Sequence, residues 1–398
     1  MNSAEIANLH QLAYEYICDE AALNNLCDDL RQASVVTLDT EFVRTRTLKP
    51  QLGLLQVYDG KRLALIDPVL ISDLSAFTQI LTNENIVKVL HSCSEDIEAL
   101  HTNLGVTPNP LFDTQFAASI LGKGASIGYA NMVETFFSIS LDKGESRTDW
   151  MARPLSNNQL DYAAADVTYL MAAYDELASE LEERNLTHCV FSESEALILK
   201  KTHPFPAEYA YLTLSNNWKL SPRSLYALKH LAHWRLDLAR LEDIAINFVI
   251  KEASMFEIAM KLPQNSSQLH QIHGLFGKQL RLYANDILRI VNDARSASEE
   301  MFPAKPQRLI DFQVHKKATA DIKLIIEETA EKTGIPSPVL ASKKQIGQVL
   351  RWCWVTQDET ELQGLKPDLL TGWRRVLFIE RLEALFSEQG TYETLRGL

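Results

Sequence analysis

Four carboxylates and one phenol in the first half of the chain have spacings that could gather them into one chemical site. Asp39 and Glu41 end an apolar, β-branched run, and alternate residues of a strand project from the same face. Asp96 follows a second apolar run, at a strand-to-helix junction where α/β proteins often place functional residues. Tyr162 and Asp166 lie one turn apart on a predicted helix, away from its apolar stripe.

Carboxylates that converge in this way repel one another unless cations or solvent separate them. Two divalent cations would neutralise the cluster, and Mg²⁺ or Mn²⁺ suits an all-oxygen ligand set. A pair of these ions suits in-line displacement at phosphorus, because one ion activates water while the other stabilises the leaving oxygen. Each feature taken alone has a plainer explanation: a strand end that frays into solvent, an acid that matches a helix dipole, or a solvated helix face.

The hydrophobic pattern predicts the elements that must position these residues. Strand-like runs are predicted at residues 35–39, 52–58, 62–66 and 86–90. Asp59-Gly60 between the second and third runs is a hairpin signal. Helices are predicted within residues 1–30, 73–81, 112–121 and 129–137. A meander of strands followed by alternating helices and strands predicts an α/β domain with a mixed sheet flanked by helices.

The helix that carries Tyr162 and Asp166 is predicted around residues 160–170, with Ser156 as its N-cap. Its apolar side chains form one stripe, at Leu160, Ala163, Ala164, Val167, Leu170 and Met171. We expect this stripe to pack the helix onto its domain. A loop through residues 143–154 should lead into the helix.

Several polar neighbours are expected to have structural roles. Ser92 or Ser94 could cap the helix that begins near Asp96. Asp113 is expected to cap another helix, and His91 is expected to pack or to form hydrogen bonds without a metal.

In order and approximate spacing, the chain resembles the three motifs of the DEDD superfamily of 3′–5′ exonucleases. The matching segments are Asp39-Thr40-Glu41, Asp96 within Ser-Glu-Asp-Ile, and Tyr162-x-x-x-Asp166, whose tyrosine is typical of the "y" branch. The flanking segments His91-Ser92-Cys93-Ser94-Glu95-Asp96, Trp150-x-x-Arg153-Pro154-Leu155-Ser156 and Gln159-Leu160-x-Tyr162-Ala163 are similar to the ribonuclease D family. The resemblance covers roughly residues 30–200 and departs from the family at none of the five key positions.

The resemblance implies a ribonuclease-H-like fold and hydrolytic 3′–5′ removal of nucleotides as nucleoside 5′-monophosphates. It implies that Asp39, Glu41 and Asp166 ligate the ion that activates water, and that Asp39 also reaches a second ion supported by Asp96. Tyr162 would hydrogen-bond the attacking water, since a phenol with a pKa near 10 orients water better than it deprotonates it. The implied substrates are RNA 3′ ends, among them tRNA precursors and other small structured RNAs.

Two alternatives remain open. A 3′–5′ DNA exonuclease could use the same centre, because the carboxylates face phosphates and not the 2′-hydroxyl. A non-catalytic nucleic-acid-binding scaffold would be indicated by a lost carboxylate, and none is lost here.

Beyond a linker near residues 200–206, helical patterns replace strand patterns. Ser221 and Pro222 are predicted to begin a helix over residues 223–241. Residues 247–259 are similar to 338–350, and the segment after Gly277 is similar to that after Gly372, which predicts two copies of one helical module. Trp234-Arg235-x-x-x-Ala239-Arg240, Ile250 and Ile272-x-Gly274-x-x-x-Lys278 resemble the HRDC domain.

The predicted organisation is therefore an exonuclease domain at residues 1–205, a first HRDC domain at 216–296 and a second, divergent HRDC-like domain at 306–398. Lys251, Lys278 and Arg281 are plausible phosphate contacts, although lysines scattered over helices are more often a solvated face.

Composition is that of a globular chain: 46% of the 398 residues are hydrophobic and the net charge is −13. The acidity lies in the first half, because residues 1–201 carry −15 and residues 202–398 carry +2. No run of 18 apolar residues could span a membrane, and acidic residues in the first 30 argue against a signal peptide. Five scattered cysteines without a CxxC pair favour a reduced, cytoplasmic protein. The absence of heptads favours a monomer.

Overall fold

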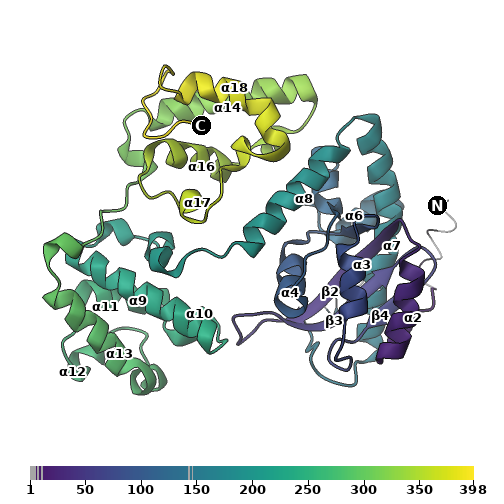
Figure 1. Ribbon diagram of the computed structural model, residues 1–398, viewed down its shortest axis with the longest axis horizontal. Coiled ribbons are helices and arrows are strands. Elements are labelled where there is room, and N and C mark those ends of the chain that lie inside the picture. Colours follow the sequence, from purple (N-terminus) through teal and green to yellow (C-terminus); the bar gives the residue numbers. More distant parts are fainter. Residues whose placement is uncertain (1–5, 7–8, 10–11, 142–143, 146) are drawn as a thin grey trace.

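The computed structural model describes residues 6, 9, 12–141, 144–145 and 147–398. Figure 1 shows an α/β domain, which ends with helix α8, and two helical domains that follow it in the chain. We call these the first helical domain, from α9 to α13, and the second helical domain, from α14 to α18. Among the residues that the structure describes, no helix combines the length and the apolarity that a membrane crossing requires.

A mixed six-stranded sheet organises the α/β domain, with strand order β1-β4-β3-β2-β5-β6. Strands β2, β3 and β4 are antiparallel neighbours, whereas β1 pairs with β4, β5 with β2 and β6 with β5 in parallel. The strands are β1 Glu15–Ile17, β2 Val35–Val43, β3 Gln51–Tyr58, β4 Leu63–Ile66, β5 Val87–Leu90 and β6 Leu111–Asp113. The predicted mixed sheet and its hairpin are confirmed.

Two edge strands were not predicted. Strand β1 lies within residues 1–30, which were predicted to be helical throughout, and β6 begins where a helix was predicted from residue 112. Each has only three residues, too few to show a period of two, so parallel pairing with β4 and β5 decides their conformation. The N-terminal part of the helix prediction falls partly outside the described residues.

Helices cover both faces of the sheet. The helices of this domain are α2 Glu20–Leu30, α3 Ser75–Thr82, α4 Ser94–Leu104, α5 Thr114–Ile120, α6 Tyr129–Phe137, α7 Asn157–Glu183 and α8 Thr187–Thr202. Side chains of α2, α3 and α4 share one core with the sheet, and Val36 and Leu38 of β2 point into it. On the opposite face, α7 packs against Leu54, Leu63 and Leu65.

Helix α7 begins where the sequence predicts. The Ser156 hydroxyl accepts a hydrogen bond from the backbone N–H of Gln159, and the Gln159 side-chain oxygen accepts one from the backbone N–H of Ser156, which forms a capping box. The predicted apolar stripe is buried except at Leu160, which is half-buried. The loop before the helix was expected over residues 143–154, of which 143 and 146 lie outside the described residues.

The two helical domains repeat the same order of elements. The first contains α9 Pro222–Leu241, α10 Ile246–Val249, α11 Glu252–Lys261, α12 Ser266–Leu269 and α13 Gly277–Ser296. The second contains α14 His315–Thr333, α15 Ser337–Leu340, α16 Lys343–Trp354, α17 Glu359–Leu362 and α18 Gly372–Phe386. Gly277 begins α13 and Gly372 begins α18, so the similar sequence segments occupy equivalent helices. Short 3-10 segments complete the fold: η2 Ala207–Thr213, η3 Asn217–Lys219, η4 Glu299–Met301, η5 Leu309–Asp311 and η6 Asp368–Leu370.

Both helical domains contact the α/β domain. The second helical domain shares a continuous hydrophobic core with it, in which Phe112 and Val190 belong to the same cluster as Phe378. The first helical domain meets the loop that follows β2, where Ala245 N donates to the Arg46 carbonyl at 2.8 Å. A buried apolar interface therefore joins the second helical domain to the α/β domain, and a polar contact joins the first.

Candidate active site

Three carboxylates from two elements meet on the face of the sheet that α7 covers. Strand alternation places Asp39 and Glu41 on this face, and α7 supplies Asp166 from above it. One carboxylate oxygen from each residue lies within 4.8 Å of the others. Residues that are 125 and more positions apart in the chain are thus gathered in one cluster, as strand and helix periodicity predict.

Two hydrogen bonds hold the helix backbone on either side of Asp166 in place over the sheet. The Thr37 hydroxyl of β2 donates to the Val167 carbonyl at 2.8 Å, and the Tyr129 hydroxyl of α6 donates to the Ala165 carbonyl at 2.9 Å. The two acceptors are the residues before and after Asp166. Sequence reasoning missed both donors, because neither position carries a local signal of its partner on α7.

Asp96 approaches from the other side of the same strand. It lies in the first turn of α4, and its carboxylate accepts a hydrogen bond from the hydroxyl of Thr40. Strand alternation points Thr40 away from Asp39 and Glu41, toward the face that α4 covers. Asp96 is therefore linked to the cluster through the middle residue of the Asp39-Thr40-Glu41 segment and is not one of the three carboxylates that lie within 4.8 Å of one another.

Asp113 holds the turn that leads to Asp96. It caps α5, as predicted, and it also accepts hydrogen bonds from the backbone of Ser92 at 2.9 Å and Cys93 at 3.3 Å. The expectation that Ser92 or Ser94 caps α4 is wrong: Cys93 is the N-cap and makes no side-chain cap. The carboxylate of Asp113 on the neighbouring strand instead holds the backbone just before the helix.

His91 has the structural role expected of it. Its two ring nitrogens are 2.9 Å from the Thr114 hydroxyl and 2.9 Å from the Ile127 carbonyl. Both nitrogens are thus engaged by protein groups.

Burial raises the pKa of Asp39, Glu41, Asp96 and Asp166, and the charges of neighbouring carboxylates add to the rise for Asp39 and Glu41. Burial, followed by the nearby charges of Asp166 and Asp96, raises the pKa of Glu41 to about 9. Burial raises the pKa of Asp166 to about 7 and that of Asp96 to about 6. For Asp39, burial and then the charge of Asp96 hold the pKa well above its usual range. Among the described residues, no lysine or arginine forms an ion pair with any of them.

Tyr162 lies beside the carboxylates. Burial, followed by the charge of Asp166 one turn along the helix, raises the pKa of the phenol, and the phenol in turn opposes the rise in the pKa of Asp166. The ring of Tyr162 is half-buried and lies 6.3 Å from that of Trp150, measured between centroids. The hydroxyl therefore stays protonated at neutral pH and can donate a hydrogen bond.

This arrangement fits hard divalent cations. The donor set consists of oxygen atoms only, and oxygen is what Mg²⁺ and Mn²⁺ prefer. The raised pKa values mean that the ionised cluster lacks compensating positive charge, which bound cations would supply.

The fold and the carboxylate cluster together define a 3′–5′ exonuclease. Residues 14–182 match a family model described as 3′–5′ exonuclease, residues 224–291 match the HRDC domain, and residues 314–382 match the ribonuclease D C-terminal HRDC domain. The chain belongs to the ribonuclease D family, and its activity is that of a hydrolytic 3′–5′ exoribonuclease.

Relatives named ribonuclease D match almost the whole chain. The protein of Escherichia coli strain K12 is 39% identical over 94% of this chain and 99% of its own length. That of Shewanella sp. strain ANA-3 is 41% identical over 94% of each. The crystal structure of Escherichia coli RNase D, described as an exoribonuclease involved in structured RNA processing, superposes with a TM-score of 0.89 at 39% identity and covers 95% of this chain and 100% of its own. The catalytic core of RRP6 from Trypanosoma brucei gives a TM-score of 0.60 at 25% identity, over 71% of this chain and 80% of its own.

Proposed function

We propose that the chain trims RNA 3′ ends with two divalent ions, Mg²⁺ or Mn²⁺, at Asp39, Glu41, Asp96 and Asp166. The observation that carries this proposal is the approach of three carboxylates within 4.8 Å, without a basic partner among the described residues. Such an arrangement is costly as a purely structural feature, because each buried negative charge raises the free energy of the next.

Each carboxylate has a place in this scheme. Asp39, Glu41 and Asp166 would hold one ion, and Asp39 would also reach the second ion, with Asp96 supporting it directly or through water. When bound, the ions would lower the pKa of water and neutralise charge on the phosphate and the leaving oxygen. Thr40 holds the Asp96 carboxylate, and Thr37 and Tyr129 hold the backbone on either side of Asp166.

Tyr162 would orient the attacking water. Its raised pKa makes it a poor base, but its protonated hydroxyl is a directed donor close to Asp166. An interaction of this kind contributes through positioning, so its loss should reduce turnover more than it reduces metal binding.

The substrates we propose are the 3′ ends of tRNA precursors and of other small structured RNAs, and the protein would act as a cytoplasmic monomer. The Escherichia coli relative, whose crystal structure is known, is described as an exoribonuclease involved in structured RNA processing. The helical domains carry the less acidic half of the chain, and helix N-termini with nearby basic residues can bind phosphates. We place the exonuclease domain at residues 1–205 and the two HRDC domains at 216–296 and 306–398.

The test compares a 3′-tailed tRNA with a DNA of matched sequence, with Mg²⁺ or Mn²⁺ and with EDTA. We expect stepwise shortening of the RNA that stops with EDTA and in Asp166→Ala. RNA shortening that survives chelation or Asp166→Ala would exclude the two-ion site, and equal or faster loss of DNA would exclude the RNA preference. Glu176→Gln, on an exposed turn of α7, is the matched control and should retain full activity.

A further inference from the structure

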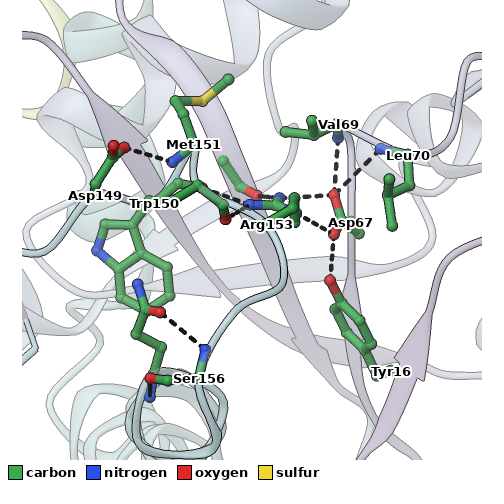
Figure 2. A network of polar contacts seen from close by, with 12 residues as sticks. Tyr16, Asp67, Val69, Leu70, Asp149, Trp150, Met151, Arg153 and Ser156 are labelled. Carbon is green, nitrogen blue, oxygen red and sulfur yellow. Dashed lines mark hydrogen bonds and ion pairs between the residues drawn. The ribbon is translucent and has the colours of Figure 1, made fainter.

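Arg153 uses its whole guanidinium group inside the α/β domain (Figure 2). It pairs bidentately with Asp67, through Nε at 2.6 Å and Nη2 at 2.7 Å. The remaining contacts go to backbone carbonyls of Gly53 at 2.6 Å, Trp150 at 2.8 Å and Ala152 at 2.8 Å. A planar guanidinium whose donors are all engaged fixes the directions as well as the distances of its hydrogen-bond acceptors.

The acceptor at the centre of this network is fully buried. Asp67 follows β4 directly, has no exposed surface, and also accepts hydrogen bonds from the Tyr16 hydroxyl and from Val69 N at 2.9 Å. Figure 2 shows these contacts on one side of the Trp150–Arg153 segment and the Ser156 cap of α7 on the other. Arg153 thus ties the segment before α7 to the end of β4.

The same network holds Trp150 close to Gly53 on strand β3. A Cβ added to Gly53 would lie 2.5 Å from the Trp150 carbonyl oxygen and 2.8 Å from its Cβ, so only glycine allows this approach. Trp150 is 1% exposed, and its Nε1 has no hydrogen-bond partner among the residues that the structure describes. The indole is therefore located by packing and by its backbone and not by a polar contact of its ring.

The indole in turn faces Tyr162. The two ring planes are inclined by 41°, and the Tyr162 ring packs against the buried cluster that contains Trp150 with Ala163 and Val167 of α7. The indole limits the rotamers that Tyr162 can adopt on the helix, because a close-packed neighbour excludes alternative ring positions. The position of its hydroxyl relative to Asp166 then depends on Trp150.

We propose that Trp150, held by Arg153 and Asp67, is a positioning residue that sets the place of the Tyr162 hydroxyl. This inference rests on the role of Tyr162 proposed above. It predicts that Trp150 contributes to turnover only through Tyr162, whereas a merely structural tryptophan would contribute in the presence and in the absence of the phenol.

A double-mutant cycle separates the two cases. The variants are Trp150→Leu, Tyr162→Phe and their combination, measured for kcat and KM on a 3′-tailed RNA with Mg²⁺. We expect Tyr162→Phe to lose about 10²-fold in kcat, as for loss of a group that orients the attacking water. Trp150→Leu should lose about tenfold by misplacing the hydroxyl, with KM and Mn²⁺ affinity unchanged. The combined variant should then equal Tyr162→Phe.

Controls keep the proposal testable if Trp150→Leu loses stability. Trp150→Phe retains a ring and should recover most of the lost rate. Phe77→Leu removes a buried ring from the opposite face of the sheet, and at equal loss of Tm it should keep kcat. Arg153→Lys cannot form the bidentate pair with Asp67. It should therefore lower kcat as Trp150→Leu does, and add no further loss to that of Tyr162→Phe.

The outcomes are distinct. A combined variant that loses the Trp150→Leu factor on top of that of Tyr162→Phe would overturn the positioning role while leaving the proposed function intact. Unchanged turnover in Tyr162→Phe would remove the tyrosine from the proposed function itself. If Phe77→Leu lost as much kcat as Trp150→Leu, the effect of Trp150 on turnover would be explained by the loss of stability alone.

Discussion

The hydroxyl of Thr40 donates a hydrogen bond to the carboxylate of Asp96 across β2. Thr40 stands between Asp39 and Glu41, so one three-residue segment serves both faces of the strand. Its outer residues meet Asp166 on α7, and its middle residue meets α4. The carboxylates of both sides are thereby held in fixed positions relative to one strand.

Thr40→Val should weaken the activity most at low pH. Burial raises the pKa of Asp96 to about 6, and the Thr40 hydrogen bond opposes that rise. Without the hydroxyl, Asp96 holds its proton to higher pH, and the acid limb of the pH–rate profile moves upward, with a loss of about tenfold near pH 6 and little above pH 8. An acid limb that stays in place would contradict the assignment. The control is Thr82→Val, which removes a hydroxyl that donates to the Thr78 carbonyl on a surface helix and should leave the acid limb in place.

The metal-free protein should lose stability as pH rises. A carboxyl group whose folded pKa exceeds its unfolded value binds more protons when folded, so its cost to stability grows from about pH 4 up to the folded pKa. The pKa values of about 6, 7 and 9 for Asp96, Asp166 and Glu41 place this window between about pH 4 and 9. Thermal unfolding in EDTA should therefore show Tm falling over this range.

Added Mg²⁺ or Mn²⁺ should reverse that loss. Because the ligands must be deprotonated to bind, the gain in Tm should increase with pH and be small near pH 5. Asp166→Asn should flatten the pH dependence in EDTA and reduce the gain from metal, whereas Glu176→Gln should leave both unchanged. A metal-induced gain that is equal at all pH values would speak against these carboxylates as the ligands.

Asp113→Ala should destabilise the domain and slow the enzyme together. The substitution removes the cap of α5 and the acceptor of Ser92 N and Cys93 N. Loss of a cap costs about 1 kcal/mol, and an unpaired buried donor costs about 1–3 kcal/mol. Urea unfolding should show a loss of this size, and kcat should fall because the turn before Asp96 is released. Full activity at reduced stability would show that this turn does not position Asp96.

The second helical domain should unfold together with the α/β domain. Arg374 is 5% exposed, pairs with Glu193 of α8, and donates to the Leu340 and Val339 carbonyls at 2.9 Å each. Arg374→Ala leaves these acceptors unpaired in an interface, which should cost about 3 kcal/mol.

Calorimetry measures this coupling. We expect one transition for the two domains in the unsubstituted protein and a lower Tm in Arg374→Ala. Arg31→Ala removes an arginine of the α/β domain whose pair with Asp28 is exposed, and it should leave Tm nearly unchanged. Two separate transitions in the unsubstituted protein would contradict the shared core.

Local periodicity was sufficient to predict much of the candidate site. A strand repeats every two residues, so Asp39 and Glu41 had to share a face, and a helix returns after nearly four residues, so Tyr162 had to lie beside Asp166. The Ser156 cap, the hairpin and the equivalent helices of the two helical domains follow from equally local patterns. In each case the residues that determine the conformation are neighbours in the chain.

Only the tertiary structure decided which distant groups hold that site in place. Strands β1 and β6 exist because β4 and β5 offer them backbone partners, and Asp113 holds the turn before α4 from 20 residues away. Arg153 meets Asp67 across 86 residues, and the core shared with the second helical domain joins segments farther apart still. No pattern within one segment specifies such pairs, because their energy depends on burial and geometry that arise only when the elements pack.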